Sequence, residues 1–201
     1  LFDGYADKFE THLVDELGYI VPQLLRKEVD EIMIISSVKN FGSALDLGGG
    51  TGLVAAQLRS ITKIIHNVDI SKKMIEVSKQ ANRYDDYFLS DIISFLAGSN
   101  VGLPLYDLSV AADTLMYSGD LRPICAGVFK RLVPGGWFVF NIEKMFVGDF
   151  KIQSNGRYFH SENYIKDICS KLGFIAHRVT NFIARKENNE DVASLLFCIQ
   201  K

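Results

Sequence analysis

The feature that most constrains the fold is a cluster of glycines in the first third of the chain. Four glycines lie within "GGGTG" (48–52), directly after the apolar run 43–47 and directly before a helix-like segment. Glycine adopts left-handed backbone angles without strain and lets another group come close to the main chain. We therefore expect a strand, a turn that binds something, and a helix; the alternative is a tight turn without a ligand.

Short apolar runs alternate with helix-like segments through the middle of the chain. The predicted strands are 43–47, 63–69, 86–90, 106–112 and 136–142, with "VPGGW" (133–137) as the turn before the last. The predicted helices are 52–60, 71–81, 91–97 and 119–132. Parallel strands need crossover connections, so this alternation predicts an α/β fold: a Rossmann-like, mostly parallel sheet with helices on both faces.

The two ends of the chain follow other patterns. Apolar residues three and four apart predict two helices before residue 40, broken at Gly18 and Pro22. After a predicted helix at 161–172, two strand-like segments at 174–184 and 192–199 flank the polar stretch "RKENNED". They predict an antiparallel C-terminal hairpin, which completes a seven-stranded sheet. We expect one domain over 1–201, with a helical N-terminal cap (1–40), a sheet core (41–145) and a late helix with the hairpin (146–201).

Composition excludes several classes of protein. The 201 residues include 22 basic and 24 acidic ones, without a Lys/Arg cluster that could follow a phosphate backbone, so no nucleic-acid partner is expected. Three widely spaced cysteines predict buried free thiols and no metal site. No apolar run reaches the roughly 18 residues of a membrane span and no signal peptide is visible, so we expect a cytoplasmic protein without a membrane partner.

The spacing of the glycines separates several kinds of nucleotide site. A dinucleotide fingerprint needs glycines at i, i+2 and i+5, but the third place holds Leu53 or Ala55 when counting starts at Gly48 or Gly50. A phosphate-binding P-loop ends in Gly-Lys-Ser/Thr, and this turn has no lysine. The turn instead has an acid followed by alternate glycines: Asp46, Gly48, Gly50 and Gly52.

This arrangement resembles motif I of the class I S-adenosylmethionine-dependent methyltransferases. The likeness extends over about residues 40–145, through "NVDIS" (67–71), "SDI" (90–92), "YDLSVAADTLMY" (106–117) and "LVPGGWFVF" (132–140). The stretches "FDGYADKFETHLVDELGY", "GRYFHSENYI" and "RKEN" resemble a bacterial subgroup of predicted, TPR-repeat-associated methyltransferases, although these residues contain no TPR repeat. Gly49 departs from the family, which commonly has Cys or another small residue at that position.

The resemblance implies S-adenosylmethionine as the cofactor and S-adenosylhomocysteine as the product, bound by the core at 41–145. The glycines would bring backbone N–H groups to the amino-acid end of the cofactor, with Asp46 orienting the loop by accepting backbone N–H bonds. Asp69 would accept both ribose hydroxyls, and Asp113 would lie near the transferred methyl. The expected cofactor-binding residues are Asp46, Gly48, Gly50, Gly52, Asp69, Ile70, Asp91, Ile92 and Asp113.

Around the adenine, Asp91 would accept from the amino group, and Ile70 and Ile92 would enclose the ring. Simple structural roles remain the alternative for these acids. Asp69 and Asp91 both precede helix-like segments and fit helix N-caps. Asp113 fits a turn residue equally well.

The acceptor is expected to be a small molecule or a group linked to an acyl carrier. Methyl transfer from a sulfonium depends on alignment, and a base is needed only for a hydroxyl or a protonated amine. The chain lacks the Pro-Cys of cytosine methylation. Its sequence at 113–116, "DTLM", differs from the Asn/Asp-Pro-Pro-aromatic motif of exocyclic-amine methylation, so methylation of nucleic-acid bases is disfavoured.

Candidate acceptor-site residues come from the cap and from the late part of the chain. The catalytic candidates are Tyr5, Tyr117 and His160. The substrate-binding candidates are Phe9, His12, Glu143, Arg157 and Tyr158. Arg157 would hold an anionic substrate and His160 would act as a base. The alternatives are core contacts for Tyr5 and Phe9 and packing beside Ser161 for His160. Despite the resemblance, we expect "RKE" (185–187) to form a solvated turn.

Three functions are compatible with these patterns. The first is an S-adenosylmethionine-dependent methyltransferase. The second is a non-catalytic module that binds the cofactor or a partner on the same fold. The third is a nicotinamide-dependent oxidoreductase, which the missing third glycine disfavours.

Overall fold

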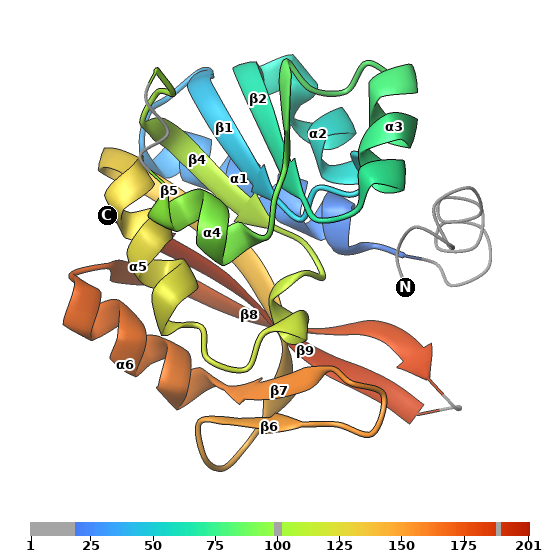
Figure 1. The fold of residues 1–201 in the computed structure, drawn as a ribbon. Helices are drawn as coiled ribbons and strands as arrows, with labels where there is room; N and C mark the ends of the chain where they lie inside the picture. Colours follow the sequence, from blue (N-terminus) through green and yellow to red (C-terminus); the bar gives the residue numbers. More distant parts are fainter. Residues whose placement is uncertain (1–18, 99–101, 188–189) are drawn as a thin grey trace.

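The structure is a computed structural model of the chain and describes residues 19–98, 102–187 and 190–201. These residues form one nine-stranded sheet flanked by helices (Figure 1). The strand order is β3-β2-β1-β4-β5-β7-β6, while β9 pairs with β5 and β8 pairs with β9. The predicted fold class, a mostly parallel Rossmann-like sheet with antiparallel C-terminal strands, is confirmed.

The parallel part of the sheet contains the strands that alternate with helices. They are β1 (Phe41–Leu47), β2 (Thr62–Asp69), β3 (Asp86–Leu89), β4 (Tyr106–Ala111) and β5 (Leu132–Met145). Neighbouring strands in the order β3, β2, β1, β4, β5 all run parallel. The strand order reverses beside β1, so the turn after β1 opens at the point where ligands bind in sheets of this type.

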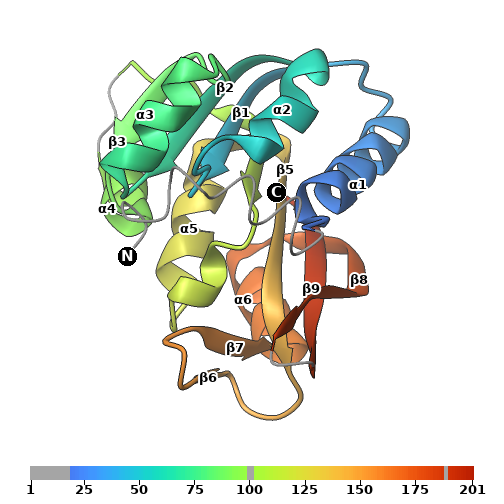
Figure 2. The same cartoon turned by 90° about the vertical axis from the view of Figure 1, so that its right-hand side faces the viewer.

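Helices cover both faces of the sheet (Figure 2). They are α1 (Val21–Ile35), α2 (Leu53–Leu58), α3 (Lys72–Gln80), α4 (Ile92–Ala97), α5 (Arg122–Arg131) and α6 (Glu162–Leu172), with short 3-10 helices η3 (Arg59–Ile61) and η4 (Leu115–Tyr117). One buried apolar cluster joins α1 and α2 to β1, β4, β5 and β9. The other joins α4, α5 and α6 to the opposite face. Alternate residues of β1 enter the two clusters: Ala44 contributes to the first, and Leu45 and Leu47 to the second.

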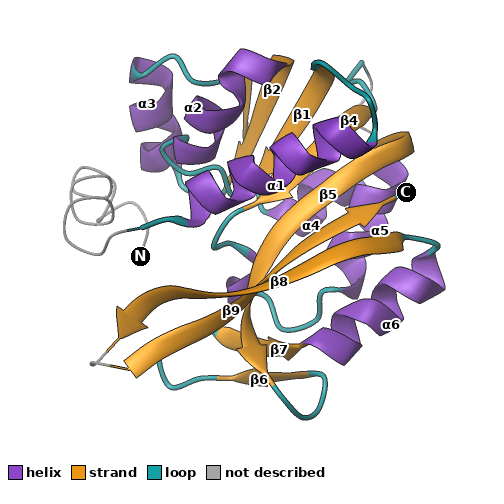
Figure 3. Ribbon diagram, turned by 180° about the vertical axis from the view of Figure 1, so that it is seen from behind, coloured by secondary structure: helices purple, strands orange, loops and turns teal. Residues whose placement is uncertain are grey.

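The C-terminal part of the chain adds two hairpins to the edges of β5 (Figure 3). β8 (Ile175–Glu187) and β9 (Glu190–Gln200) form the long antiparallel hairpin, and β9 pairs with β5. β6 (Phe150–Ile152) and β7 (Tyr158–Ser161) form the second hairpin. Glu143 pairs with Phe159 of β7 and with Ser194 of β9, so the two hairpins lie on opposite sides of the end of β5.

Three expectations about this region need correction. The loop-like stretch 155–161 includes β7, because β5 extends beyond β4 and offers its edge to another strand. The turn predicted at 133–137 lies within β5, where the pairing with β4 shifts register between Tyr106 and Leu108. The sheet exceeds the predicted seven strands because β6 and β7 join it.

Other expectations concern the cap and the cysteines. The second predicted cap helix is present as α1, and the first lies outside the described residues. Cys125, Cys169 and Cys198 are buried free thiols, as predicted. No helix within the described ranges is long and apolar enough to cross a membrane.

Candidate functional site

Four acids lie at the carboxyl ends of neighbouring parallel strands. Asp46 and Asp69 belong to the ends of β1 and β2, and Asp91 and Asp113 follow β3 and β4 by two residues each. β3, β2, β1 and β4 are consecutive in the sheet, so the four acids lie along one edge of the sheet. This edge contains the strand-order reversal and is the candidate functional site.

The glycine loop between β1 and α2 follows a left-handed path at alternate residues. Gly48, Gly50 and Gly52 have φ angles of 70°, 54° and 97°. The Gly48 N–H donates to the carbonyl of Val68 at 2.7 Å, and the Gly52 N–H donates to that of Gly49 at 2.9 Å. L side chains rarely adopt such angles, which explains the alternate glycines predicted to form the turn.

The surroundings of the loop glycines differ. A Cβ at Gly48 would stand 2.4 Å from Cγ2 of Thr114, in the connection after β4. A Cβ at Gly52 would stand 2.7 Å from Cδ of Arg83. At Gly50 no atom within the described part of the chain lies within 4 Å of the Cβ position. The backbone of Gly50 therefore borders open space in which a ligand could approach the main chain.

Asp69 joins the end of β2 to the glycine loop. Its Oδ2 accepts from the Gly50 N–H at 2.8 Å, and its Oδ1 accepts from the Ser71 N–H at 2.7 Å. The N-cap of α3 is Ser71, whose hydroxyl accepts from Met74 N, so Asp69 does not have the helix-capping role considered as its alternative. The carboxylate is thus held against the most open part of the loop.

Asp46 has a different environment from the one expected. Its Oδ2 accepts from the Tyr84 hydroxyl at 2.8 Å, and its Oδ1 has no hydrogen-bond partner within residues 19–98, 102–187 and 190–201. The expectation that Asp46 accepts backbone N–H bonds of the loop was wrong, since the Gly50 N–H points to Asp69 instead. Burial raises the pKa of Asp46 to about 7, although the Tyr84 hydrogen bond acts in the opposite direction.

The residues expected around adenine lie after β2 and β3. Asp91 is the N-cap of α4 and accepts from the Ser94 N–H at 2.9 Å, which lowers the pKa of its carboxyl. This is the capping role considered as its alternative, and it leaves the carboxylate exposed. Ile70 is 64% exposed, whereas Ile92 is partly buried against the core beneath α4.

Asp113 is held by a residue that the sequence analysis missed. Its backbone has φ of 48°, unusual for a residue with a side chain. Asn141 of β5 donates from Nδ2 to Asp113 Oδ1 at 2.6 Å and accepts from the Asp113 N–H at 2.8 Å. Tyr19 also donates to the Asp113 carboxyl, whose pKa burial raises. Asn141 is fully buried. The only sign of it in the sequence was that it is the single polar residue in the otherwise apolar run 136–142.

In the region where the acceptor is expected to bind, side chains from three parts of the chain meet at Glu143. Arg185 Nη2 lies 2.6 Å and Arg157 Nη1 lies 3.4 Å from Glu143 Oε1, and Gln153 donates to Oε2. Glu143 is 1% exposed, so these donors compensate a buried charge. The prediction that Arg185 belongs to a solvated turn was wrong, because its side chain is only 13% exposed. The Arg157 guanidinium lies 5.9 Å from the ring centre of Tyr117, which is 40% exposed.

His160 has an interior position. It is 0% exposed, its Nε2 lies 2.9 Å from the Gly119 carbonyl, and its ring stacks against Tyr164. Because a carbonyl accepts, Nε2 carries the proton. Burial lowers the pKa of His160. These contacts match the packing alternative beside Ser161, which is the N-cap of α6, better than the role of an accessible base.

The remaining acceptor candidates fall into two groups. Tyr158 is partly buried, and it packs so closely on Gly119 that a Cβ there would stand 2.9 Å from its ring. Tyr5, Phe9 and His12 lie outside the described residues. Within the described ranges, no group of three or more His, Cys, Asp or Glu residues could hold a metal ion.

A cavity of about 560 Å³ lies at the opposite edge of the sheet. It is lined by the beginnings of β1 and β5, including Phe41 and Trp137. Asp107 in its wall accepts from the Gly42 and Ser43 N–H groups at 2.8 Å each. These contacts join β4 to β1, and the four acids of the candidate site lie at the other ends of the strands.

The sheet order and the glycine loop at its reversal point define the fold class. The chain is similar to an S-adenosylmethionine-dependent methyltransferase from Clostridium acetobutylicum, with a TM-score of 0.70 and 16% identity, covering 99% of this chain and 98% of that one. It is also similar to the N-methyltransferase NodS from Bradyrhizobium japonicum, solved with S-adenosyl-L-homocysteine, with a TM-score of 0.66 and 20% identity, covering 89% and 86%. The chain has the class I methyltransferase fold.

The sequence comparisons match the part of the chain that contains the glycine loop and the parallel strands. Residues 45–140 match the family model described as a methyltransferase domain, and they lie within the range 40–145 over which the sequence resembles such enzymes. Malonyl-[acyl-carrier protein] O-methyltransferase of Salmonella typhimurium is 24% identical over 139 residues, which are 69% of this chain and 50% of that protein. The chain thus spans about half the length of this curated relative.

Proposed function

We propose that the chain is an S-adenosylmethionine-dependent methyltransferase that acts on a small-molecule or carrier-linked acceptor. The observation that carries this proposal is the geometry at Gly50. Its N–H is fixed on Asp69, and its Cβ position is open, next to the strand-order reversal. A ligand with an amino-acid end and a ribose fits such a combination of accessible main chain and carboxylate.

The cofactor roles follow the strand ends. Asp69 would bind the ribose hydroxyls, since a carboxylate oxygen accepts more than one hydrogen bond and can keep its backbone donors. The exposed side chain of Ile70 and the exposed carboxylate of Asp91 suit the adenine. Asp113, fixed by Asn141, would face the methionine end. S-adenosylmethionine supplies an activated methyl on a sulfonium.

The chain itself would contribute alignment more than acid–base chemistry. Holding the acceptor in line with a good leaving group supplies most of the rate, so few catalytic side chains are needed. Tyr117 follows Asp113 by four residues, and its exposed ring lies 5.9 Å from the Arg157 guanidinium, which supports it as a contact for the acceptor. Buried His160 would act by holding the Gly119 carbonyl in place.

We propose that the acceptor carries an anionic group. Arg157 and Arg185 both reach Glu143 near the end of β5, and the Arg157 guanidinium lies 5.9 Å from the ring centre of Tyr117. Guanidinium groups suit carboxylates and phosphates. The similarity to a malonyl-[acyl-carrier protein] O-methyltransferase also supports a carrier-linked acid, at 24% identity. Membership of the TPR-associated subgroup, the single-domain boundaries and a cytoplasmic location remain predictions.

Calorimetric titration with S-adenosylmethionine and S-adenosylhomocysteine tests the cofactor. We expect both to bind, and Asp69→Ala to weaken binding about ten- to a hundredfold, because a charged hydrogen bond is lost. The matched control is Asp86→Ala at the other end of the neighbouring strand β3, which should change affinity less than about twofold.

Two results would contradict this proposal. Folded protein that binds neither compound but quenches NADH fluorescence would favour the oxidoreductase. Equal losses in Asp69→Ala and Asp86→Ala would mean that the cofactor lies elsewhere.

A further inference from the structure

The connection between α3 and β3 contacts the glycine loop. Arg83 Nη1 donates to the Thr51 carbonyl at 3.1 Å. Tyr84 Oη lies 2.8 Å from Asp46 Oδ2 and 3.1 Å from the Gly49 carbonyl oxygen, and its side chain is buried. Residues more than 30 positions further along the chain therefore support the loop from within the protein.

Tyr84 also explains the residue at position 49. Gly49 is not among the loop glycines with positive φ, so its backbone would accept a side chain. A side chain would nevertheless clash with its neighbours, because a Cβ at this position would stand 2.4 Å from Tyr84 Oη and 2.7 Å from Asn67 Oδ1. The tyrosine hydroxyl fills the volume that Cys or another small residue would otherwise use.

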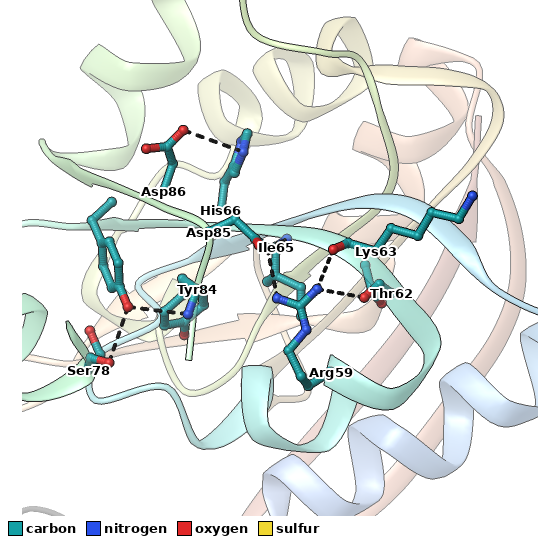
Figure 4. Close-up of polar contacts among 10 residues, drawn as sticks. Arg59, Thr62, Lys63, Ile65, His66, Ser78, Tyr84, Asp85 and Asp86 are labelled. Atoms are coloured by element: carbon teal, nitrogen blue, oxygen red, sulfur yellow. Dashed lines mark hydrogen bonds and ion pairs between the residues drawn. The ribbon is translucent and has the colours of Figure 1, made fainter. Parts of the chain in front are cut away.

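The backbone that carries Tyr84 is fixed by its own contacts (Figure 4). The next residue, Asp85, accepts from Ile65 N and from Arg59 Nη1, both at 2.7 Å. The Tyr84 N–H donates to the hydroxyl of Tyr87 at 3.3 Å, and Tyr87 donates to the Ser78 carbonyl. With its backbone anchored in this way, the Tyr84 ring is a rigid support.

We propose that Tyr84 is a positioning residue that holds the glycine loop in its binding conformation through Asp46 and the Gly49 carbonyl. Its single proton is donated mainly to Asp46, the nearer acceptor, with the carbonyl also within reach. The next residue along the loop is Gly50, whose open side would meet the ligand. The inference rests on the proposed function, because it takes the ligand of this loop to be S-adenosylmethionine.

The first test is the affinity for S-adenosylhomocysteine of Tyr84→Phe, measured by calorimetry. We expect an approximately tenfold loss, from the loss of one hydrogen bond to a carboxylate. Tyr106→Phe is the matched control, because it removes another buried tyrosine hydroxyl, which lies 2.9 Å from His66 Nδ1 and belongs to the beginning of β4, at the opposite end of the strands from the loop. Its affinity should stay within about twofold of wild type. Equal affinities of the two variants would overturn the inference.

A pH profile separates positioning from general support of the fold. The Tyr84 hydrogen bond lowers the pKa of Asp46, while Asp69 raises it, and Tyr19 is a further titratable group that interacts with this carboxyl. The midpoint of any pH dependence of S-adenosylhomocysteine binding that arises from Asp46 should therefore move to higher pH in Tyr84→Phe. It should not move in Tyr106→Phe. A fixed midpoint in both variants would contradict the assigned contact.

A double-mutant cycle tests the spatial claim without any ligand. Gly49→Ala should lower the melting temperature less in the Tyr84→Phe background than in wild type, because the nearest clashing atom is gone. Strictly additive shifts would overturn the claim that Tyr84 fills this volume. Wild-type protein that binds no S-adenosylhomocysteine would refute the proposed function, and the cycle would still decide whether Tyr84 supports the loop.

Discussion

The proposed cofactor edge, at the carboxyl ends of the parallel strands, and the proposed acceptor side, around Glu143, are built from different kinds of contact. At the cofactor edge, main-chain groups of the glycine loop meet short acidic side chains at strand ends, as in the bond from Gly50 N to Asp69. On the acceptor side, long side chains from β5, the β6–β7 hairpin and β8 meet at Glu143. Backbone geometry therefore defines the first region, whereas charge compensation between distant segments defines the second.

Among the substitutions that test this difference between the two regions, we expect Gly48→Ala to have the largest effect. Gly48→Ala combines a left-handed backbone with a Cβ only 2.4 Å from Thr114, so the loop must move. We expect S-adenosylhomocysteine affinity to fall more than about a hundredfold in calorimetry, since the binding main chain itself is displaced. Gly156→Ala is the control: it has φ of 82° but open space, and lies in the β6–β7 turn. It should cost about 1–2 kcal/mol of stability and leave affinity unchanged.

Asn141→Ala tests whether a buried side chain also contributes to the cofactor edge. It removes the two hydrogen bonds between Asn141 and Asp113, at 2.6 and 2.8 Å. We expect a loss of about 2 kcal/mol in unfolding free energy and an approximately tenfold loss of S-adenosylhomocysteine affinity. Asn181→Ala, which removes an exposed contact with Lys144, should change neither quantity. Unaltered affinity in Asn141→Ala would place Asp113 outside the cofactor site.

Arg185→Ala tests the independence of the acceptor side. Glu143 would keep Arg157 and Gln153 but lose its 2.6 Å partner while remaining buried. We expect a loss of about 2 kcal/mol in urea unfolding and no change in S-adenosylhomocysteine affinity. Arg122→Ala, which breaks an exposed pair with Asp120, should change the free energy of unfolding much less than Arg185→Ala does. A large loss of cofactor affinity in Arg185→Ala would break the distinction between the two regions.

We expect substitution of Asp46 to have the smallest effect on stability, and this effect depends on pH. Burial raises its pKa to about 7, so the folded protein retains a proton that the unfolded chain loses near pH 4. The contribution of this group to stability therefore falls as pH rises from about 4 to about 7. Asp46→Asn removes the charge, and its stability relative to wild type should be higher at pH 8 than at pH 6 by about 1 kcal/mol. Urea unfolding at both pH values measures this, and a difference that is constant with pH would contradict the assigned burial.

Sequence patterns predicted the parallel half of the fold because its signals are local. The run before Gly48 became β1, and the segments ending at Asp69 and preceding Asp91 became β2 and β3, with boundaries within about two residues. The hairpin formed by β6 and β7 was not predicted. Its strands have three and four residues, and β7 is a strand because the end of β5 offers an edge.

The residues of the candidate site also fall into two groups, those predicted from local sequence signals and those decided by packing. The glycine spacing and the strand-end acids could be read from short stretches, because each depends on the conformation of its own turn. Tyr84 and Asn141 carried only weak signals, since their roles arise from contacts with Asp46 and Asp113 across neighbouring strands. The burial of His160 was likewise decided by packing against Tyr164 and Phe150.

The sequence by itself determined the strand–turn–helix order, the left-handed glycines and the acids at the strand ends, because these follow from the backbone preferences and apolar periodicity of adjacent residues. Only the tertiary structure decided which side chains support them. The bonds of Tyr84 to Asp46 and of Arg185 to Glu143 join residues 38 and 42 positions apart. Such pairs form because a buried carboxylate needs a donor, and the donor is whichever residue the packed sheet brings within reach.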